Sequence, residues 1–185
     1  MKLKFSIINN LKTFIVLIFA FTIYGCVSIK PASVKSGKNL FETFYVGEDG
    51  TQYFIKPLNF LNSQNKEELR ADFTFRYKNE VKDSVTINFS LLSPKNLKNI
   101  DSLVFSNTNH KIVSTNVELL FNEKASKLFK SRFSTKVSLL DFNQMFENND
   151  WKIITHKFED HSTYTSDKRT KKAIKKLRDE IFILF

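Results

Sequence analysis

The feature that most constrains the fold is an alternation of apolar and polar residues with a period of two. In LRADFTFRY at 69–77, apolar residues occupy every second position, and polar residues occupy the positions between them. SVTINFSL at 84–91 repeats this pattern. Because successive side chains of a strand point to opposite faces, the pattern predicts two strands, each with one buried and one wet face. The polar turn between them predicts an antiparallel hairpin.

Further strand signals occur before and after these two segments. The sequence GEDG at 47–50 is typical of a tight turn, and it separates two segments rich in aromatic and β-branched residues. We expect the polar stretch EDHSTYTSD at 159–167 to be a loop. The remaining candidate strands cover residues 41–46, 51–58, 102–106, 112–121, 129–139 and 151–158.

Two segments carry helix signals. Asp141 followed by Gln144 has the spacing of a capping box and predicts a short helix near 141–148. The C-terminal segment 167–185 has apolar residues at intervals of three and four, opposite a basic side, and Asp167 is placed to cap its start. The expected apolar stripe consists of Ile174, Leu177, Ile181 and Leu184.

These elements predict an α+β fold that is mainly β. We expect an antiparallel sheet or sandwich of about seven to eight strands, with the short helix near 141–148 and a C-terminal amphipathic helix against it. Residues 39–185 would form a single β-rich domain, which is long enough to bury a core of its own. The 20 phenylalanines are interpreted first as core residues.

The N-terminal segment has the layout of an export signal. Its first 12 residues contain three lysines and no acid, and an uninterrupted apolar run, FIVLIFAF, follows at 14–21. This run is shorter than the roughly 18–20 residues that span a bilayer. The alternative is an uncleaved membrane anchor that extends to about Ile29.

The residues after this run resemble the lipobox of bacterial lipoproteins. Ile23, Tyr24 and Gly25 precede Cys26, which is the single cysteine of the chain, although leucine is more usual where Ile23 stands. The resemblance, which covers the first 26 residues, implies a diacylglycerol with acyl chains such as palmitate on the Cys26 sulfur. It also implies a signal peptide over 1–25 and a lipidated tether over 26–38. The alternative is that Cys26 is merely a small apolar residue at the end of a signal.

The same resemblance bears on location. In some bacterial groups, acids just after the lipidated cysteine direct lipoproteins to the cell surface, whereas no acid occurs here between Cys26 and Glu42. We therefore expect a lipid-anchored protein of the bacterial cell envelope, in the outer membrane and facing the periplasm.

Charge predicts the class of partner. The chain has a formal net charge of +10, and removal of the three signal lysines leaves 26 basic against 19 acidic residues, or +7. Such a domain is drawn to anionic surfaces, which in a periplasm are lipid head groups, lipopolysaccharide, cell-wall carboxylates or acidic proteins. Nucleic acid is not expected for an exported chain. The C-terminal segment contributes the candidate basic surface Lys168, Arg169, Lys171, Lys172, Lys175, Lys176 and Arg178.

This basic helix has two interpretations. It can lie on an anionic membrane with its apolar stripe in the lipid. It can equally pack the stripe on the sheet and leave its lysines in water.

One segment has residues suited to catalysis. HKFEDH contains His156, Glu159, Asp160 and His161, and these residue types bind zinc or transfer protons. The spacing matches no metal motif, and on one extended strand the two histidines would face opposite ways. The alternative is a strand end that runs into a polar loop. No Gly-rich phosphate loop and no GxSxG sequence is present.

The sequence therefore favours a non-enzymatic envelope lipoprotein that binds or scaffolds an acidic component. One alternative is a hydrolase acting on envelope polymers or lipids, with His156 and His161 as its candidate residues. The other is a carrier with an apolar cavity inside a Phe-rich sheet. We expect neither a cofactor nor a metal.

Overall fold

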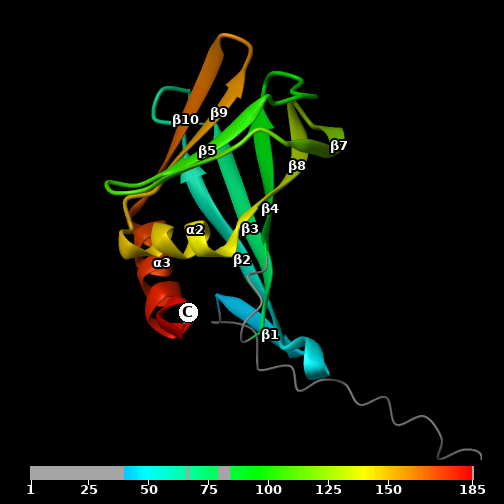
Figure 1. Ribbon diagram of the computed structural model, residues 1–185. Helices are drawn as coiled ribbons and strands as arrows, with labels where there is room; N and C mark the ends of the chain where they lie inside the picture. The colour runs from blue at the N-terminus through cyan, green and yellow to red at the C-terminus, as the bar shows by residue number, and fades with distance from the viewer. Residues whose placement is uncertain (1–39, 66, 79–83, 185) are drawn as a thin grey trace, which may run out of the picture. The chain divides into compact units, whose positions relative to one another are not determined.

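The structure is a computed structural model that describes residues 40–65, 67–78 and 84–184 (Figure 1). These residues belong to one compact unit that spans Lys35–Phe185. The predicted signal peptide 1–25, the predicted tether 26–38 and Cys26 lie outside the described residues.

The described residues form ten strands in one antiparallel sheet. The strand order is β6-β5-β9-β10-β2-β3-β4-β8-β7, and β1 pairs with β2 beside this path. The strands are β1 (Phe41–Tyr45), β2 (Thr51–Leu61), β3 (Glu68–Tyr77), β4 (Ser84–Ser93), β5 (Ser102–Ser106), β6 (Lys111–Ser114), β7 (Glu118–Ala125), β8 (Leu128–Ser138), β9 (Lys152–Lys157) and β10 (Asp160–Ser166).

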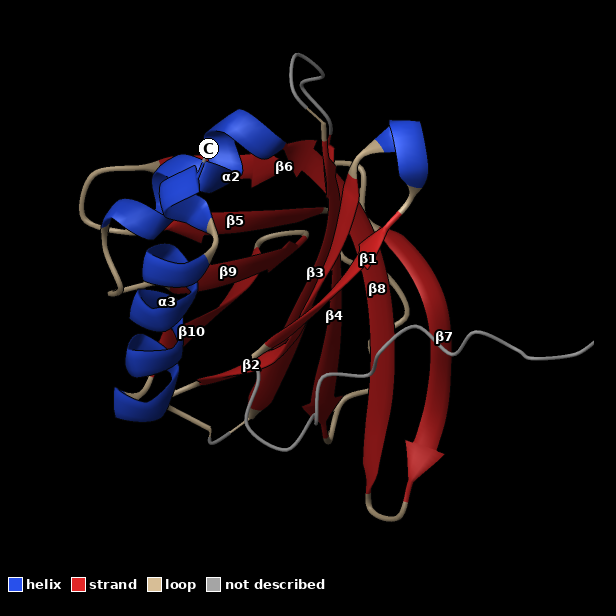
Figure 2. Cartoon of the chain, turned by 90° about the horizontal axis from the view of Figure 1, so that it is seen from below, coloured by secondary structure: helices blue, strands red, loops and turns tan. Residues whose placement is uncertain are grey.

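The sheet curls strongly (Figure 2). The hydroxyl groups of Ser114, on β6, and Thr135, on β8, are hydrogen-bonded to each other. Thr135 Oγ1 also lies 2.7 Å from the carbonyl oxygen of Asn116. Strands from distant places in the strand order therefore meet, and the fold is one curled sheet rather than a sandwich of two.

The alternating pattern that predicts β3 and β4 is confirmed. The two strands pair antiparallel, with Phe73 opposite Ile87 and Phe75 opposite Val85. These four side chains are buried, whereas Arg70 on the other face of β3 is exposed. The predicted β1–β2 hairpin is also confirmed, with a short 3-10 helix, η1 (Gly47–Asp49), at its turn.

Aromatic side chains fill the inside of the curled sheet. Trp151 makes edge-to-face contacts with Phe73, Phe105 and Phe142. Phe146 contacts the same Trp151 ring, with 4.8 Å between the ring centroids. All five side chains are at most 2% exposed. The expectation that abundant phenylalanine serves the core is therefore confirmed at these positions.

The predicted short helix starts earlier than expected. Helix α2 covers Leu139–Gln144, and a 3-10 helix, η2, continues over Met145–Glu147. The prediction that Asp141 starts the helix is wrong, because the Oγ of Ser138 accepts a hydrogen bond from the backbone N–H of Asp141 and Ser138 is the N-cap. Asp141 instead lies in the first turn, where a negative charge is favourable.

The C-terminal helix is confirmed, with one correction. Helix α3 covers Lys168–Glu180, and Asp167 caps it by accepting a hydrogen bond of 2.7 Å from the Thr170 N–H. Ile174, Leu177 and Ile181 are fully buried. Leu184 is 63% exposed, so its place in the stripe is wrong. The chain leaves the α-helix before Leu184 and forms a 3-10 turn, η3 (Phe182–Leu184).

Two regions account for the underestimated number of strands. The predicted strand 112–121 is divided into β6 and β7. The predicted loop 159–167 is mostly strand β10, which pairs with β9 on one side and β2 on the other. Pairing on both sides stabilises a strand whose sequence is polar, because its backbone groups are satisfied regardless of side-chain type.

Strand β7 is an edge of the sheet. It pairs with β8, and three adjacent apolar side chains, Leu119, Leu120 and Phe121, are each more than a third exposed. A bulge interrupts the pairing between Leu119 and Phe121. The charged side chains of Glu123 and Lys130 form an ion pair of 3.3 Å across the same two strands.

Candidate functional site

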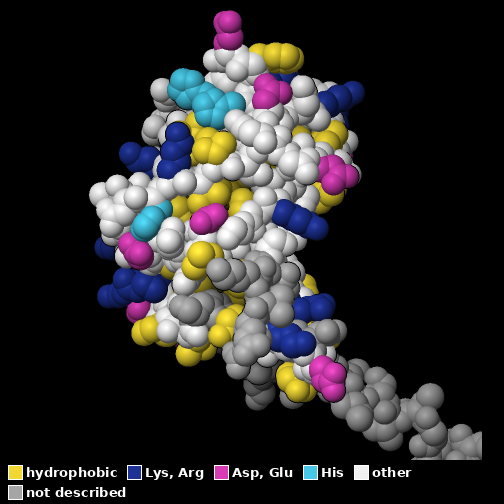
Figure 3. All heavy atoms as spheres, viewed as in Figure 1, with side chains coloured by type: hydrophobic (Ala, Val, Ile, Leu, Met, Phe, Trp, Pro, Cys, Tyr) yellow, Lys and Arg dark blue, Asp and Glu magenta, His cyan; other side chains and the backbone are white. Residues whose placement is uncertain are grey.

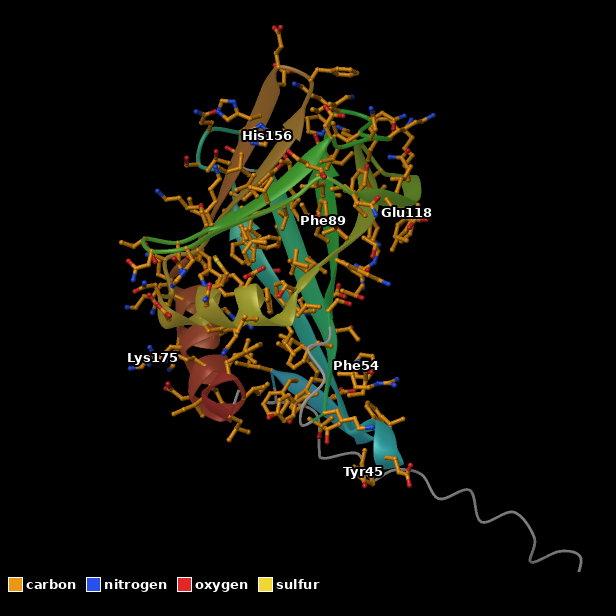
Figure 4. All side chains as sticks on the ribbon, viewed as in Figure 1. Tyr45, Phe54, Phe89, Glu118, His156 and Lys175 are labelled. Carbon is orange, nitrogen blue, oxygen red and sulfur yellow. The ribbon has the colours of Figure 1, made fainter. Side chains whose placement is uncertain are left out.

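The β9–β10 hairpin brings His156 and His161 together. The two residues are direct cross-strand partners, and their ring centroids are 6.1 Å apart. His156 is labelled on β9 in Figure 4. The expectation that they face opposite ways is wrong, because a turn lies between them and cross-strand partners share a face of the sheet. The space-filling view shows histidine side chains gathered at this end of the sheet (Figure 3).

The turn of this hairpin is held by Asp101. Its Oδ2 accepts a hydrogen bond of 2.5 Å from the backbone N–H of Phe158, and its own N–H donates to the carbonyl oxygen of His156. Phe158 has a positive φ of 53° and is 78% exposed. The Asp101 contacts therefore hold an aromatic ring in solvent at the tip of the hairpin.

A cleft of about 630 Å³ lies beside this turn. It is hereafter called the hairpin cleft. Its lining combines polar side chains from three separate parts of the chain, 65–67, 93–100 and 155–162, with a few apolar ones. The lining residues are Asn65, Glu67, Ser93, Lys95, Asn96, Leu97, Ile100, Thr155, Lys157, Phe158, Glu159, Asp160, His161 and Ser162.

Glu67 is the buried charged group of the hairpin cleft. It is 8% exposed. Ser93 Oγ donates to Glu67 Oε1 at 2.6 Å, and the Tyr164 hydroxyl donates to Oε2 at 3.3 Å. Within the described ranges, both hydrogen-bond partners of this carboxylate are neutral hydroxyl groups. A buried carboxylate without a cation is costly unless hydrogen bonds or a ligand compensate it.

The connection between β2 and β3 positions Glu67. The backbone N–H of Asn62 donates to the Glu67 carbonyl oxygen at 3.0 Å, and the Glu67 N–H donates to Asn65 Oδ1 at 3.0 Å. The pairing of Glu68 with Leu92 then places Glu67 opposite Ser93, at the end of β4. The carboxylate is therefore fixed by backbone contacts as well as by its own hydrogen bonds.

Tyr164 keeps its proton in this environment. Burial raises the pKa of the Tyr164 hydroxyl, and the negative charge of Glu67 raises it further, while hydrogen bonds with Ser162 and Thr155 act in the opposite direction. The neutral hydroxyl is the form that donates to Glu67. Tyr164, which does not itself line the hairpin cleft, is thus a neutral donor to the Glu67 carboxylate.

Sequence reasoning found one part of the hairpin cleft and missed the other. Residues 157–161 line it, including His161, whereas His156 does not. Glu67 and Ser93 in the lining, and Tyr164 as a hydrogen-bond partner of Glu67, were not predicted. The sequence STYTS, with its β-branched and aromatic residues, is the signal that favours strand β10 and would have placed Tyr164. No local pattern links Glu67 to the other two.

The third histidine of the chain, His110, lies elsewhere. His110 Nε2 is 2.7 Å from Glu147 Oε2, and His110 does not line the hairpin cleft. In the portion of the chain that the structure describes, no group of three or more His, Cys, Asp or Glu residues is arranged to hold a metal ion. No described helix has both the length and the apolar character that crossing a membrane requires.

Helix α3 presents most of its basic residues to solvent. Its buried stripe of Ile174 and Leu177 faces the fold, and the Thr170 hydroxyl donates to the Asn59 carbonyl of β2 at 2.6 Å. Lys176 is paired with Glu180 at 3.5 Å, and Arg178 with Asp179 at 3.0 Å. For the other five, no ion pair is found among the described residues. These five, hereafter the basic face, are Lys168, Arg169, Lys171, Lys172 and Lys175, of which Lys175 is labelled in Figure 4.

Comparisons of this chain with protein-family models, with curated proteins and with solved structures find no match.

Proposed function

We propose that this chain is a lipid-anchored, non-enzymatic binding module of the bacterial envelope. A lipid on Cys26 would hold it in the outer membrane, facing the periplasm, and the basic face of α3 would engage anionic envelope components. The observation that carries the proposal is the basic face itself, which consists of five exposed cations without ion-paired acids among the described residues.

The orientation of α3 determines which side chains the helix can offer to an anionic membrane. Because Ile174, Leu177 and Ile181 are buried, the helix does not offer its apolar stripe to a membrane. The interaction would therefore be electrostatic, at about 1 kcal/mol for each Lys or Arg near an anionic surface. It would weaken as salt shortens the range of the charges.

The packing of the core bears on the carrier alternative. A carrier needs an apolar cavity, whereas Trp151 and its phenylalanine neighbours fill the inside of the curled sheet with ring contacts. The hydrolase alternative is favoured by one observation, the presence of Glu67, Glu159 and His161 in the lining of the same cleft. It would predict turnover of an envelope polymer that is lost in the variant Glu67→Gln.

The anchor is tested by mass spectrometry of the mature protein and by membrane fractionation. We expect the wild-type chain to begin at Cys26 with an added diacylglycerol, and to sediment with membranes. Cys26→Ala should abolish the added diacylglycerol, because the sulfur that would carry it is gone. The matched control Ser28→Ala should behave like wild type. A free thiol on a chain that still begins at Met1 would contradict the anchor.

The basic face is tested with the non-lipidated variant Cys26→Ser and vesicles that contain an anionic phospholipid. Reversal of three charges, Lys171→Glu, Lys172→Glu and Lys175→Glu, should lower vesicle binding at least about tenfold, because each cation contributes about 1 kcal/mol. The control reverses the exposed lysines Lys124, Lys127 and Lys136, which changes the net charge equally at another place. Equal losses in both variants would show that net charge, and not the basic face, determines binding.

A further inference from the structure

The hairpin cleft has the character of a ligand site that is separate from the basic face. We propose that it binds a hydroxylated ligand with a primary ammonium group, of the amino-sugar class, and that the ammonium pairs with the Glu67 carboxylate. The anchor and the basic face are not needed for this inference.

The first argument is the acceptor capacity that remains on the Glu67 carboxylate beside its two described hydrogen bonds. An ionised carboxylate has about four acceptor positions, and the described contacts use two of them, from Ser93 and Tyr164. Both donors are neutral. A ligand ammonium would supply up to three N–H donors together with the compensating charge.

The second argument is the local charge. The carboxylates of Glu67, Glu159 and Asp160 line the hairpin cleft against the ammonium groups of Lys95 and Lys157. Among the described lining residues, and with His161 neutral, carboxylates therefore outnumber ammonium groups by three to two, in a chain with an overall charge of +10. A negative site in a basic protein selects a cationic ligand over the anions that the rest of the surface attracts.

The third argument is the remainder of the lining. Thr155, Ser162 and Asn96 offer hydroxyl and amide groups that donate and accept hydrogen bonds, as sugar hydroxyls require. The Phe158 ring stands exposed at the rim, where it can cover the apolar face of a sugar ring. A volume of about 630 Å³ is within the range of ordinary small-molecule sites.

The fourth argument is that the site is already formed. The Asn62 and Asn65 contacts hold the Glu67 backbone, and Asp101 holds the turn that carries Phe158. A ligand would therefore meet groups already in place, which lowers the entropy cost of binding.

The test is titration calorimetry of the full mature chain in its non-lipidated form, Cys26→Ser. The probes are the trisaccharide of glucosamine and the trisaccharide of N-acetylglucosamine, at a pH where the free amines are protonated. They share the sugar framework, and acetylation removes the positive charge. We expect the glucosamine probe to bind at least about tenfold more tightly, because a hydrogen bond to a charged group exceeds a neutral one by about that factor.

Two variants locate the binding. Glu67→Gln keeps the side-chain shape and should weaken binding of the glucosamine probe at least about tenfold, whereas Glu123→Gln, on β7 outside the cleft, should leave it unchanged. Phe158→Ala should weaken binding of both probes, and it cannot disturb the core because the side chain is 78% exposed.

Equal binding of the two probes, or absence of binding by both, would overturn the proposal. Binding of the glucosamine probe that survives both Glu67→Gln and Phe158→Ala would overturn it as well. Charge reversal of the basic face should leave binding of the glucosamine probe unchanged. A failure of the proposed role of the basic face can therefore be distinguished from a failure of the proposed ligand site.

Discussion

Replacement of Trp151 by alanine is expected to lower the free energy of unfolding by about 3–5 kcal/mol. The ring is fully buried among Phe73, Phe105, Phe142 and Phe146, and its removal would leave a cavity between the sheet and the α2–η2 segment. The indole also donates to the carbonyl oxygens of Met145 at 2.7 Å and Asn148 at 2.9 Å. Loss of this donor adds to the cost of the cavity.

The measurement is urea denaturation followed by far-ultraviolet circular dichroism, because Trp151 is the one tryptophan of the chain and its fluorescence disappears with the substitution. The matched variant Trp151→Phe keeps an aromatic ring and removes the indole donor. It should lower the free energy of unfolding by about 1–3 kcal/mol. A loss below about 1 kcal/mol for Trp151→Ala would contradict the packing described here.

The second large effect is expected at the β1–β2 turn. Gly50 has φ 88°, and a Cβ added there would lie 2.2 Å from the carbonyl oxygen of Tyr77. Backbone strain and this overlap together should lower the free energy of unfolding of Gly50→Ala by about 2–4 kcal/mol, because the added Cβ overlaps backbone atoms that cannot move aside. The substitution should also separate β1 from the sheet, since the Val46 N–H donates to the Gly50 carbonyl oxygen at 2.8 Å.

Gly47 provides the control within the same turn. Its φ is also positive, at 64°, but a Cβ added there meets nothing within 4 Å. Gly47→Ala should therefore lower the free energy of unfolding by only about 1 kcal/mol, the ordinary penalty of a left-handed backbone conformation. Urea denaturation and amide exchange of β1 would measure both variants. Equal costs would show that the approach to Tyr77 does not matter.

The parts of the fold that could be predicted are those that one segment specifies alone. The period-two pattern at 69–77 predicts β3 because each side chain of that strand has either the core or water as its environment. The start of α3 follows from Asp167, whose capping bond is local. Strand β10 was not predicted from its own polar sequence. It is stabilised by pairing with β9 and β2, and a local sequence pattern carries no information on that pairing.

The candidate site likewise combines residues that a local sequence pattern indicates with residues that only the fold brings together. Histidines and carboxylates close together in the sequence predict a polar site near His156 and His161; His161 lines the hairpin cleft, whereas His156 does not. Glu67, Ser93 and Tyr164 come from the β2–β3 connection, the end of β4 and the middle of β10. Only the sheet order brings these three together, so no spacing in the sequence predicts their contact.

The exposed edge at β7 has a consequence for the behaviour of the protein in concentrated solution. No strand of the described residues pairs with the outer side of β7, so an extended chain could add there, and the side chains of Leu119, Leu120 and Phe121 would add apolar area to such a contact. The bulge bends the strand, and the charges of Glu118, Glu123 and Lys124 must be desolvated before a second strand can add. The bulge and these charges therefore oppose aggregation through addition of strands at this edge.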